Sequence, residues 1–307
     1  MADERVRESS RNPPLPADFA AAAGTPIVVT TDGSAWVLAA GNRVVRIGEG
    51  MSMEQEVATT GLYRGKVAEL VTIFGARSNG WASSSAFGDL AEYLDTSQAN
   101  LNSVSAATQY YAVSTSAADS TAGAGVDRLR IVYLDANGYE QIGTVTLNGT
   151  TQVAIPFAMS YVQYMETEHS TQPDRYAQGN ISITSLNGAA TTATTVERIV
   201  AGGNRSLTFH WKCPVDCEAF LIRGRAFAIS NTMDVRLRAK IWANDGLSNA
   251  FHFLSRAFLT AGSNSSPIFN YLRIPPTAEL KVSAIPGGTP AGNKLDASLN
   301  LIKVKLA

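Results

Sequence analysis

The fold is decided by the stretch Arg128-Leu-Arg-Ile-Val-Tyr-Leu134, Asp135-Ala-Asn-Gly138, Tyr139-Glu-Gln-Ile-Gly-Thr-Val-Thr-Leu147. Two runs rich in β-branched and aromatic residues flank an Asn-Gly pair, which readily adopts the positive φ angles of a tight hairpin turn. The stretch therefore predicts an antiparallel hairpin. A second pair, Asn148-Gly149, follows at once, so we expect a three-stranded meander that ends with residues 151–155.

The C-terminal hundred residues repeat this β pattern. In Asp234–Ile241 apolar and charged residues alternate, which indicates a strand with one buried face. In the last strand the apolar phase slips between Leu301 and Ile302, which predicts a β-bulge there. Short strands separated by Gly, Pro and Asn turns are typical of an all-β fold with antiparallel β-sandwich or jelly-roll domains.

The N-terminal residues differ from the rest. Prolines interrupt residues 1–24, so this segment is expected to be an extended arm that lies against a partner. We expect three units: residues 1–52 as an extended N-terminal arm with a short β-hairpin, residues 53–203 as a β-rich central domain, and residues 204–307 as a C-terminal β-sandwich. The first unit is expected to anchor the protein.

Charge is scarce in this chain. Of its 307 residues 17% are charged and the formal net charge is −1, whereas about 25% charged residues is ordinary for a soluble domain. The lack of a basic excess argues against nucleic acid as a partner. No apolar run is long enough for membrane insertion, so we expect synthesis in the cytoplasm. Low charge suits a subunit whose faces are covered by neighbours, and we expect a homo-oligomer, with a trimer favoured.

The sequence predicts no catalytic residues, no cofactor and no metal site. Cys213 and Cys217 are too few for a disulfide framework or a zinc site. We expect them to be reduced and half-buried, and a local disulfide is the alternative. His210 and His252 are expected at outward-facing strand positions, and His169 in a solvated loop.

Two sets of residues remain candidates for contact with a glycan or another subunit. The first set is aromatic and could stack on sugars, although core or interface packing is the plainer interpretation; it comprises Trp81, Tyr110 and Tyr111. The second set could form a basic strip on the C-terminal sheet, with a solvated strand face as the plainer interpretation; it comprises Arg223, Arg225, Arg236 and Arg238. An enzyme would need paired carboxylates, and the best local cluster is Asp89, Glu92 and Asp95.

The segment from about Ser114 to Thr151 resembles a family of tailed-phage virion proteins. The resemblance is carried by a Ser/Asp/Ala-Gly-rich lead, a Leu-Asp-x-Asn element and a Thr-Val-Thr-Leu-Asn-Gly-Thr-Thr element, which here are Ser116–Gly123, Leu134–Asn137 and Thr144–Thr151. The upstream Phe74–Asn79 is similar to the family's Phe-Gly-Arg-Asn element but departs from it by an inserted Ala and a Ser. Arg273–Val282 also looks like the family's closing strands.

The resemblance implies a structural, non-enzymatic component of a bacteriophage or phage-like particle. A head-mounted spike, fibre or decoration protein is favoured over a tail or tail-fibre component. The implied partners are other capsid or tail proteins, reached through the N-terminal arm, copies of the same chain, and host-surface polysaccharide. A polysaccharide-degrading enzyme and a free-standing lectin-like module are the alternatives from other classes.

Overall fold

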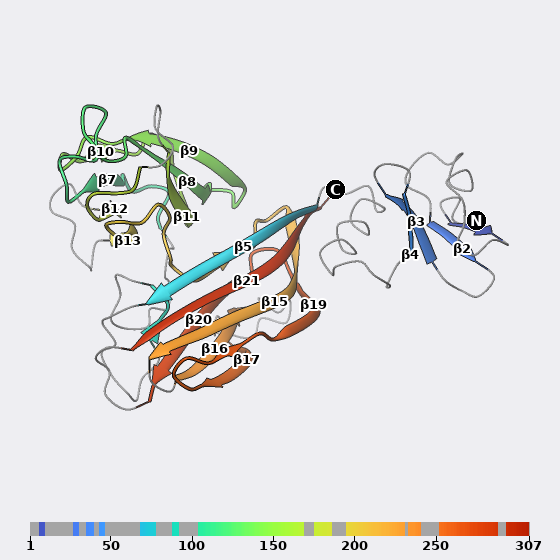
Figure 1. Cartoon of the computed structure of the whole chain (residues 1–307). Coiled ribbons are helices and arrows are strands. Elements are labelled where there is room, and N and C mark those ends of the chain that lie inside the picture. The colour runs from blue at the N-terminus through green and yellow to red at the C-terminus, as the bar shows by residue number, and fades with distance from the viewer. Residues whose placement is uncertain are drawn as a thin grey trace.

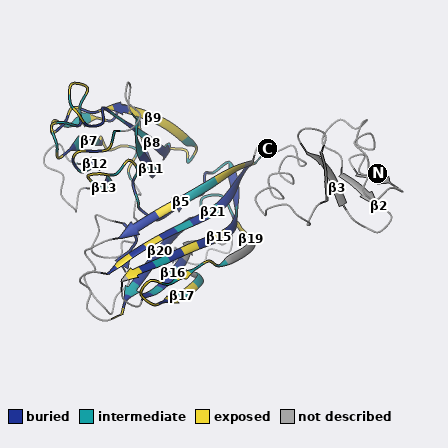
Figure 2. Cartoon of the chain, viewed as in Figure 1, coloured by how far each residue is buried: buried dark blue, intermediate teal, exposed yellow. Residues whose placement is uncertain are grey.

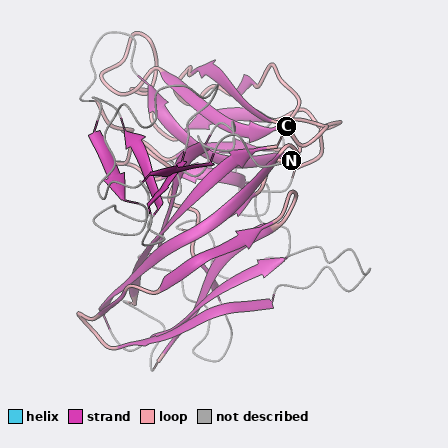
Figure 3. Cartoon of the chain, turned by 90° about the vertical axis from the view of Figure 1, so that its right-hand side faces the viewer, coloured by secondary structure: helices cyan, strands magenta, loops and turns pink. Residues whose placement is uncertain are grey.

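A computed structural model describes the chain over residues 6–9, 27–30, 35–39, 43–46, 68–77, 88–91, 104–168, 175–185, 195–230, 233–240, 252–287 and 293–306. Within these ranges the regular structure consists of strands, and no helix occurs (Figure 3). All pairings except that of β1 with β2 are antiparallel in the described part. The all-β prediction with antiparallel sheets is therefore confirmed.

The N-terminal strands form a small sheet in the order β1-β2-β3-β4. These strands are β1 (Val6–Ser9), β2 (Ile27–Thr30), β3 (Ala35–Ala39) and β4 (Arg43–Arg46). The antiparallel pairing of β2 with β3 confirms the short hairpin expected there. Residues 6–9 are extended, but they pair in parallel with β2 of the same chain, so this part of the arm has an intramolecular partner. The rest of residues 1–24 lies outside the described ranges.

Two facing sheets form a central unit around one apolar core. The first has the order β10-β7-β12-β13 and contains β7 (Tyr111–Ser114), β10 (Val153–Ala154), β12 (Ile181–Thr184) and β13 (Thr195–Ile199). The second has the order β11-β8-β9 and contains β8 (Arg128–Leu134), β9 (Glu140–Thr146) and β11 (Tyr161–Glu168). Their shared core includes Leu129, Ile131, Val162, Ile181 and Ile183.

The hairpin of β8 and β9 is confirmed, with Gly138 at a φ of 85° in its turn. The predicted third strand of the meander is wrong, because β10 pairs with β7 of the facing sheet. The Asn148-Gly149 turn diverts the chain: the Gly149 N–H donates to the Asp119 carbonyl at 2.8 Å, and the Ser114 N–H donates to the Gly149 carbonyl at 3.0 Å. These bonds hold the turn against the other sheet, so the chain crosses over instead of folding back on β9.

A longer sandwich contains the C-terminal strands (Figure 1). One sheet has the order β14-β20-β16-β17, with β6 paired to β20; its strands are β6 (Gly88–Asp89), β14 (His210–Lys212), β16 (Met233–Lys240), β17 (His252–Leu259) and β20 (Glu279–Pro286). The other has the order β18-β15-β21-β5, with β19 paired to β15; its strands are β5 (Ala68–Arg77), β15 (Cys217–Ser230), β18 (Asn264–Ser265), β19 (Ile268–Ile274) and β21 (Lys294–Lys305). Val235 and Leu237 point into the core between them, as the alternation in β16 predicts.

The pairing of β5 with β21 and of β6 with β20 joins residues 68–77 and 88–89 to the C-terminal sandwich. The predicted boundary at residue 204 assigns them instead to the central domain. Sequence periodicity does not show which strands pair when they lie this far apart in the sequence.

The predicted bulge lies in the neighbouring strand. The pairing of β21 with β5 is regular, whereas the register of β15 against β21 shifts between Leu221 and Arg223. The apolar phase slips in β21 because both of its faces are buried at this end. Leu301 packs into the sandwich core, and Ile302 packs with Ile222 and Val304 on the opposite face.

The two larger units are joined by hydrogen bonds between β11 and residues 204–212. Met165 and Ser206 exchange bonds, with the Ser206 N–H donating to the Met165 carbonyl at 2.9 Å and the Met165 N–H donating to Ser206 Oγ at 3.0 Å. Gln163 Nε2 donates to the Lys212 carbonyl at 2.5 Å. Lys303 of β21 adds an ion pair to Glu140 of β9. This continuous bonding fixes one unit against the other.

Candidate functional site

The outer face of β15, β21 and β5 brings together aromatic, cationic and hydrogen-bonding side chains from strands far apart in the sequence. Inward positions on these strands fill the sandwich core, so the alternate residues face outward, as the burial pattern shows (Figure 2). In register, Arg225 lies opposite Ser298 and Ser298 opposite Phe74. We call this surface the Arg225 face; it comprises Thr72, Phe74, Arg223, Arg225, Phe227, Asp296, Ser298 and Asn300.

Two adjoining hollows mark the Arg225 face. One has a volume of about 360 Å³ and is lined by Arg223, Gly224, Arg225, Ser266, Ser298 and Asn300. The other has a volume of about 230 Å³ and is lined by Phe74, Arg225, Phe227, Asp296, Ala297 and Ser298. Arg225 and Ser298 line both hollows, so the two form one continuous depression with a polar end and an aromatic end.

The charged groups of this face are exposed. Arg223 and Arg225 are both exposed. Partial burial raises the pKa of the Asp296 carboxyl above its usual value. At the edge of the face the Arg205 guanidinium lies 5.3 Å from the centre of the Phe74 ring and 4.0 Å from that of the Tyr164 ring. The face therefore combines positive charge with hydrogen-bond donors and acceptors.

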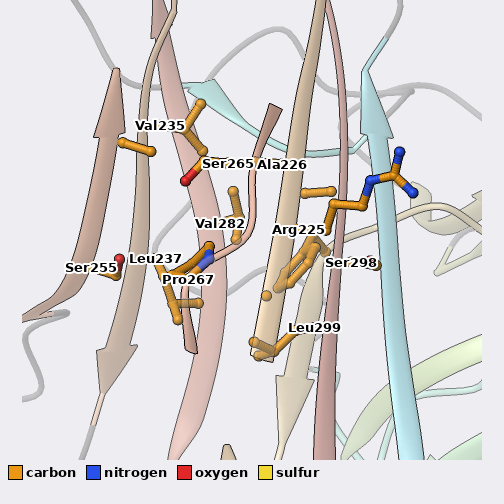
Figure 4. A pocket seen from close by; sticks show the side chains of 14 residues that line it. Arg225, Ala226, Val235, Leu237, Ser255, Ser265, Pro267, Val282, Ser298 and Leu299 are labelled. Atoms are coloured by element: carbon orange, nitrogen blue, oxygen red, sulfur yellow. The ribbon is translucent and has the colours of Figure 1, made fainter. Parts of the chain in front are cut away.

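A small cavity between the two sheets of the sandwich differs from these hollows in its mostly apolar lining. Its volume is about 40 Å³, and most of the side chains that line it are apolar, among them Val235, Leu237, Val282 and Leu299. The Arg225 side chain reaches away from these apolar groups across β21 toward β5 (Figure 4). The cavity has room for little more than a few waters, so Arg225 serves the outer face.

The predicted basic strip is divided between two sheets. Arg223 and Arg225 lie on β15, whereas Arg236 and Arg238 lie on β16 of the facing sheet. Arg236 alternates with the core residues Val235 and Leu237, so it points to the side of the sandwich opposite Arg223 and Arg225. Arg236 bonds to the Asp234 carboxylate at 3.0 Å. The side chain of Arg238 is outside the described part.

The aromatic candidates have different locations. Tyr110 is buried in the core of the central unit, where its hydroxyl accepts a hydrogen bond from the Ser105 N–H at 2.9 Å. Tyr111 is half-buried in β7. Trp81 lies outside the described residues. Tyr110 is therefore a core packing residue, which is the plainer of the two interpretations of its sequence position.

The carboxylate cluster considered for an enzyme contains one described member. Asp89 is fully buried, where Lys281 Nζ lies 3.2 Å from its Oδ2 and the Ser283 hydroxyl donates to its Oδ1 at 2.7 Å. A carboxylate held in this way cannot reach a substrate. Glu92 and Asp95 lie outside the described residues. Among those described, no group of His, Cys, Asp and Glu side chains could hold a metal ion, and no helix is long and apolar enough to cross a membrane.

The expected exposure of His210 is wrong. Its ring is fully buried where the two larger units meet, and the Tyr161 hydroxyl lies 2.5 Å from its Nδ1. The central unit covers the face of β14 that periodicity assigns to solvent. The side chain of His252 and all of His169 lie outside the described part. Cys213 and Cys217 are free thiols, and both are buried.

The segment that carries the family resemblance forms a compact turn around Asp119. This carboxylate is fully buried and accepts hydrogen bonds from Ser114 Oγ at 2.5 Å and from the backbone N–H groups of Val126, Gln178 and Gly179 at 3.3, 2.9 and 2.9 Å. A Cβ on Gly125 would meet Asp119 Oδ1 at 2.1 Å, so the motif needs glycine there. Asp119 therefore stabilises the turn and is not accessible to a ligand.

The sequence interpretation missed Phe74, Phe227, Asp296, Ser298 and Asn300 as members of the accessible face. The alternation of polar and apolar residues in Lys294–Asn300 was a signal for the last three. Their association with Phe74 depends on the pairing of β21 with β5, which no local pattern specifies.

Comparisons with known proteins find weak structural similarities and no similarity in sequence. No family model matches the sequence, and no curated protein matches it. The structure of the Gx strain of infectious bursal disease virus is similar with a TM-score of 0.24 and 11% identity, over 78% of this chain and 72% of that chain. The crystal structure of the VP2 subviral particle of that virus gives 0.22 and 10%, over 78% and 72%. The tandem CBM22 domains of Xyn10C from Paenibacillus barcinonensis give 0.20 and 11%, over 78% and 91%.

Proposed function

We propose that this chain is a structural subunit of a bacteriophage or phage-like particle, and that it assembles with copies of itself. The observation that carries the proposal is that two edge strands of the described part lack a partner on one side and expose apolar side chains. In the described part of the chain, β9 pairs only with β8 and β17 only with β16. Each of these edge strands presents a large apolar side chain, Ile142 with 60% and Phe258 with 67% of its surface exposed.

Proteins that stay monomeric usually protect their sheet edges, because unpaired backbone groups beside apolar side chains invite pairing with another chain. In a particle subunit the same edges are covered by neighbours. The sparse charge of the chain fits this arrangement, since a largely covered surface needs little charge for solubility. The resemblance of Ser116–Thr151 to tailed-phage virion proteins points to the same class.

The finer parts of the proposal are a homotrimer, a head-mounted spike, fibre or decoration role in preference to a tail role, and attachment to other virion proteins through residues 1–52. The C-terminal sandwich contacts host-surface polysaccharide. The chain has no enzymatic activity in this proposal, which the burial of the Asp89 carboxylate supports.

The assembly is tested by light scattering on the purified full chain. We expect a single oligomer of the 32.6 kDa chain, and we expect Ile142→Lys and Phe258→Lys to dissociate it, because a lysine on an edge strand opposes pairing. Ala201→Lys, an equal charge change at an exposed turn position outside β9 and β17, is the control. A monomer at all concentrations, unaltered by these substitutions, would remove the support for a particle subunit.

A further inference from the structure

We propose that the Arg225 face binds a segment of an acidic polysaccharide, with the sugar carboxylates on the arginines and the sugar hydroxyls on Asp296. This inference deepens the proposed function, because it assigns a site and a ligand class to the contact with host-surface polysaccharide.

The first step is the placement of positive charge. Arg223 and Arg225 alternate on β15, so their Cα atoms are roughly 7 Å apart on one side of the strand. Both are exposed and both line the same 360 Å³ hollow, together with Ser298 and Asn300. A guanidinium binds a carboxylate through two parallel hydrogen bonds. Two such groups in a row suit a chain that carries acidic groups at intervals.

The second step is the acidic residue in the same depression. Asp296 lines the adjoining 230 Å³ hollow beside Arg225. Its carboxylate can only accept hydrogen bonds when ionised, and sugar rings offer many hydroxyl donors. The sugar–phosphate backbone of DNA offers no hydroxyl donors. The combination therefore favours an acidic sugar chain over DNA.

The third step is the aromatic end of the depression. Phe74 has 40% of its surface exposed and lies across Ser298 from Arg225. Phe227 lies opposite Asp296 and lines the same hollow. Apolar ring surface beside hydrogen-bonding groups is the arrangement that suits a sugar, whose faces carry C–H groups and whose rim carries hydroxyls. The rigid sheet holds these groups in place without a loop.

The test measures binding of the full chain to polygalacturonate, with neutral dextran and a single-stranded DNA oligonucleotide as comparison probes. We expect binding to polygalacturonate, none to dextran, and weaker binding to DNA. Arg225→Gln should weaken polygalacturonate binding at least about tenfold, as expected for the loss of a charge-assisted pair. Arg273→Gln makes the same charge change at an exposed arginine of β19, outside the depression, and should have little effect.

Asp296→Ala separates recognition from simple charge attraction. If Asp296 accepts sugar hydroxyls, its removal weakens polygalacturonate binding about threefold, because a hydrogen bond to a charged acceptor outweighs a screened surface repulsion. Stronger binding by this variant, equal effects of Arg225→Gln and Arg273→Gln, DNA bound as tightly as polygalacturonate, or no binding to polygalacturonate would each overturn the assignment. An unchanged melting temperature shows that each variant is folded.

The outcome is distinguishable from that of the proposed function. If the chain assembles but does not bind polygalacturonate, the site is wrong and the structural role stands. If it binds as a stable monomer, the site stands and the chain is a lectin-like module.

Discussion

The substitution Asp119→Asn tests whether the segment that resembles phage virion proteins acts through structure. The Asp119 carboxylate is fully buried and accepts four hydrogen bonds, three of them from backbone N–H groups. Each oxygen serves two donors: Oδ1 those of Val126 and Gln178, and Oδ2 those of Ser114 and Gly179. An asparagine turns one oxygen into an amide donor, so at least one backbone N–H loses its acceptor.

The expected cost follows from these bonds. A hydrogen bond to a charged group contributes about 1.5–3 kcal/mol, and an unsatisfied buried donor costs about 1–3 kcal/mol. Since one N–H is left unsatisfied and the remaining bonds lose their charge, we expect Asp119→Asn to lower the free energy of unfolding by about 3 kcal/mol. The Ser114 hydroxyl can rotate to accept from the new amide, which keeps the cost from rising further.

The assay is urea unfolding of the full chain, together with amide hydrogen exchange at Gln178 and Gly179. Asp135→Asn is the matched control, because Asp135 also accepts two backbone N–H bonds, from Asn137 and Tyr139 at 2.8 and 3.0 Å, but in an exposed turn. Water replaces those bonds, so the control should cost less than about 1 kcal/mol. Equal effects of the two substitutions would refute the reasoning.

Three further predictions concern buried and paired groups. Asp89→Ala leaves the buried Lys281 ammonium without its carboxylate and should lower the free energy of unfolding by about 3–5 kcal/mol. Adding Lys281→Met to this variant should recover part of the lost stability. If nothing is recovered, the broken ion pair is not the cause of the loss. Burial raises the pKa of the Cys213 and Cys217 thiols, that of Cys217 to about 12. Iodoacetamide at pH 8 should therefore label the two cysteines only after unfolding. Rapid labelling of the folded chain would contradict their burial. Burial raises the pKa of Asp234, but hydrogen bonds from its two arginine neighbours outweigh it and lower that pKa overall. The Asp234 carboxylate and its two arginine neighbours therefore stabilise the fold fully above the pKa that Asp234 has in the unfolded chain, and this stabilisation is lost as the pH falls. The difference in unfolding free energy between wild type and Asp234→Asn should therefore shrink below about pH 4. A difference that grows there would refute the pairing.

The sequence predicted those parts of the fold that local chemistry determines. Asn137-Gly138 specified the hairpin of β8 and β9 because its glycine adopts a positive φ. The alternation in β16 correctly separated Val235 and Leu237 from the outward charges. Asn148-Gly149 was also recognised as a turn, but the strand that pairs with the segment after it was not. Hydrogen bonds of this turn to Asp119 and Ser114 determine where the chain goes next.

The candidate site depended more heavily on long-range pairing. Arg223 and Arg225 were predicted from their spacing on one strand, and both line the accessible depression. Their expected companions belong to β16 of the facing sheet, since alternation gives the side of a strand but not the sheet to which it belongs. His210 was misjudged for the same reason: the unit that covers it comes from another part of the chain.

The most direct test of the particle role is the location of this protein in purified particles. An antibody against the C-terminal sandwich, or a small tag inserted at Ser263 in the exposed turn after β17, marks the chain in cryo-electron microscopy of intact particles. We expect added density at regular, symmetry-related positions on the particle, with a head location favoured. Particles that lack this chain, while it is abundant as a free protein in the infected cell, would contradict the particle role.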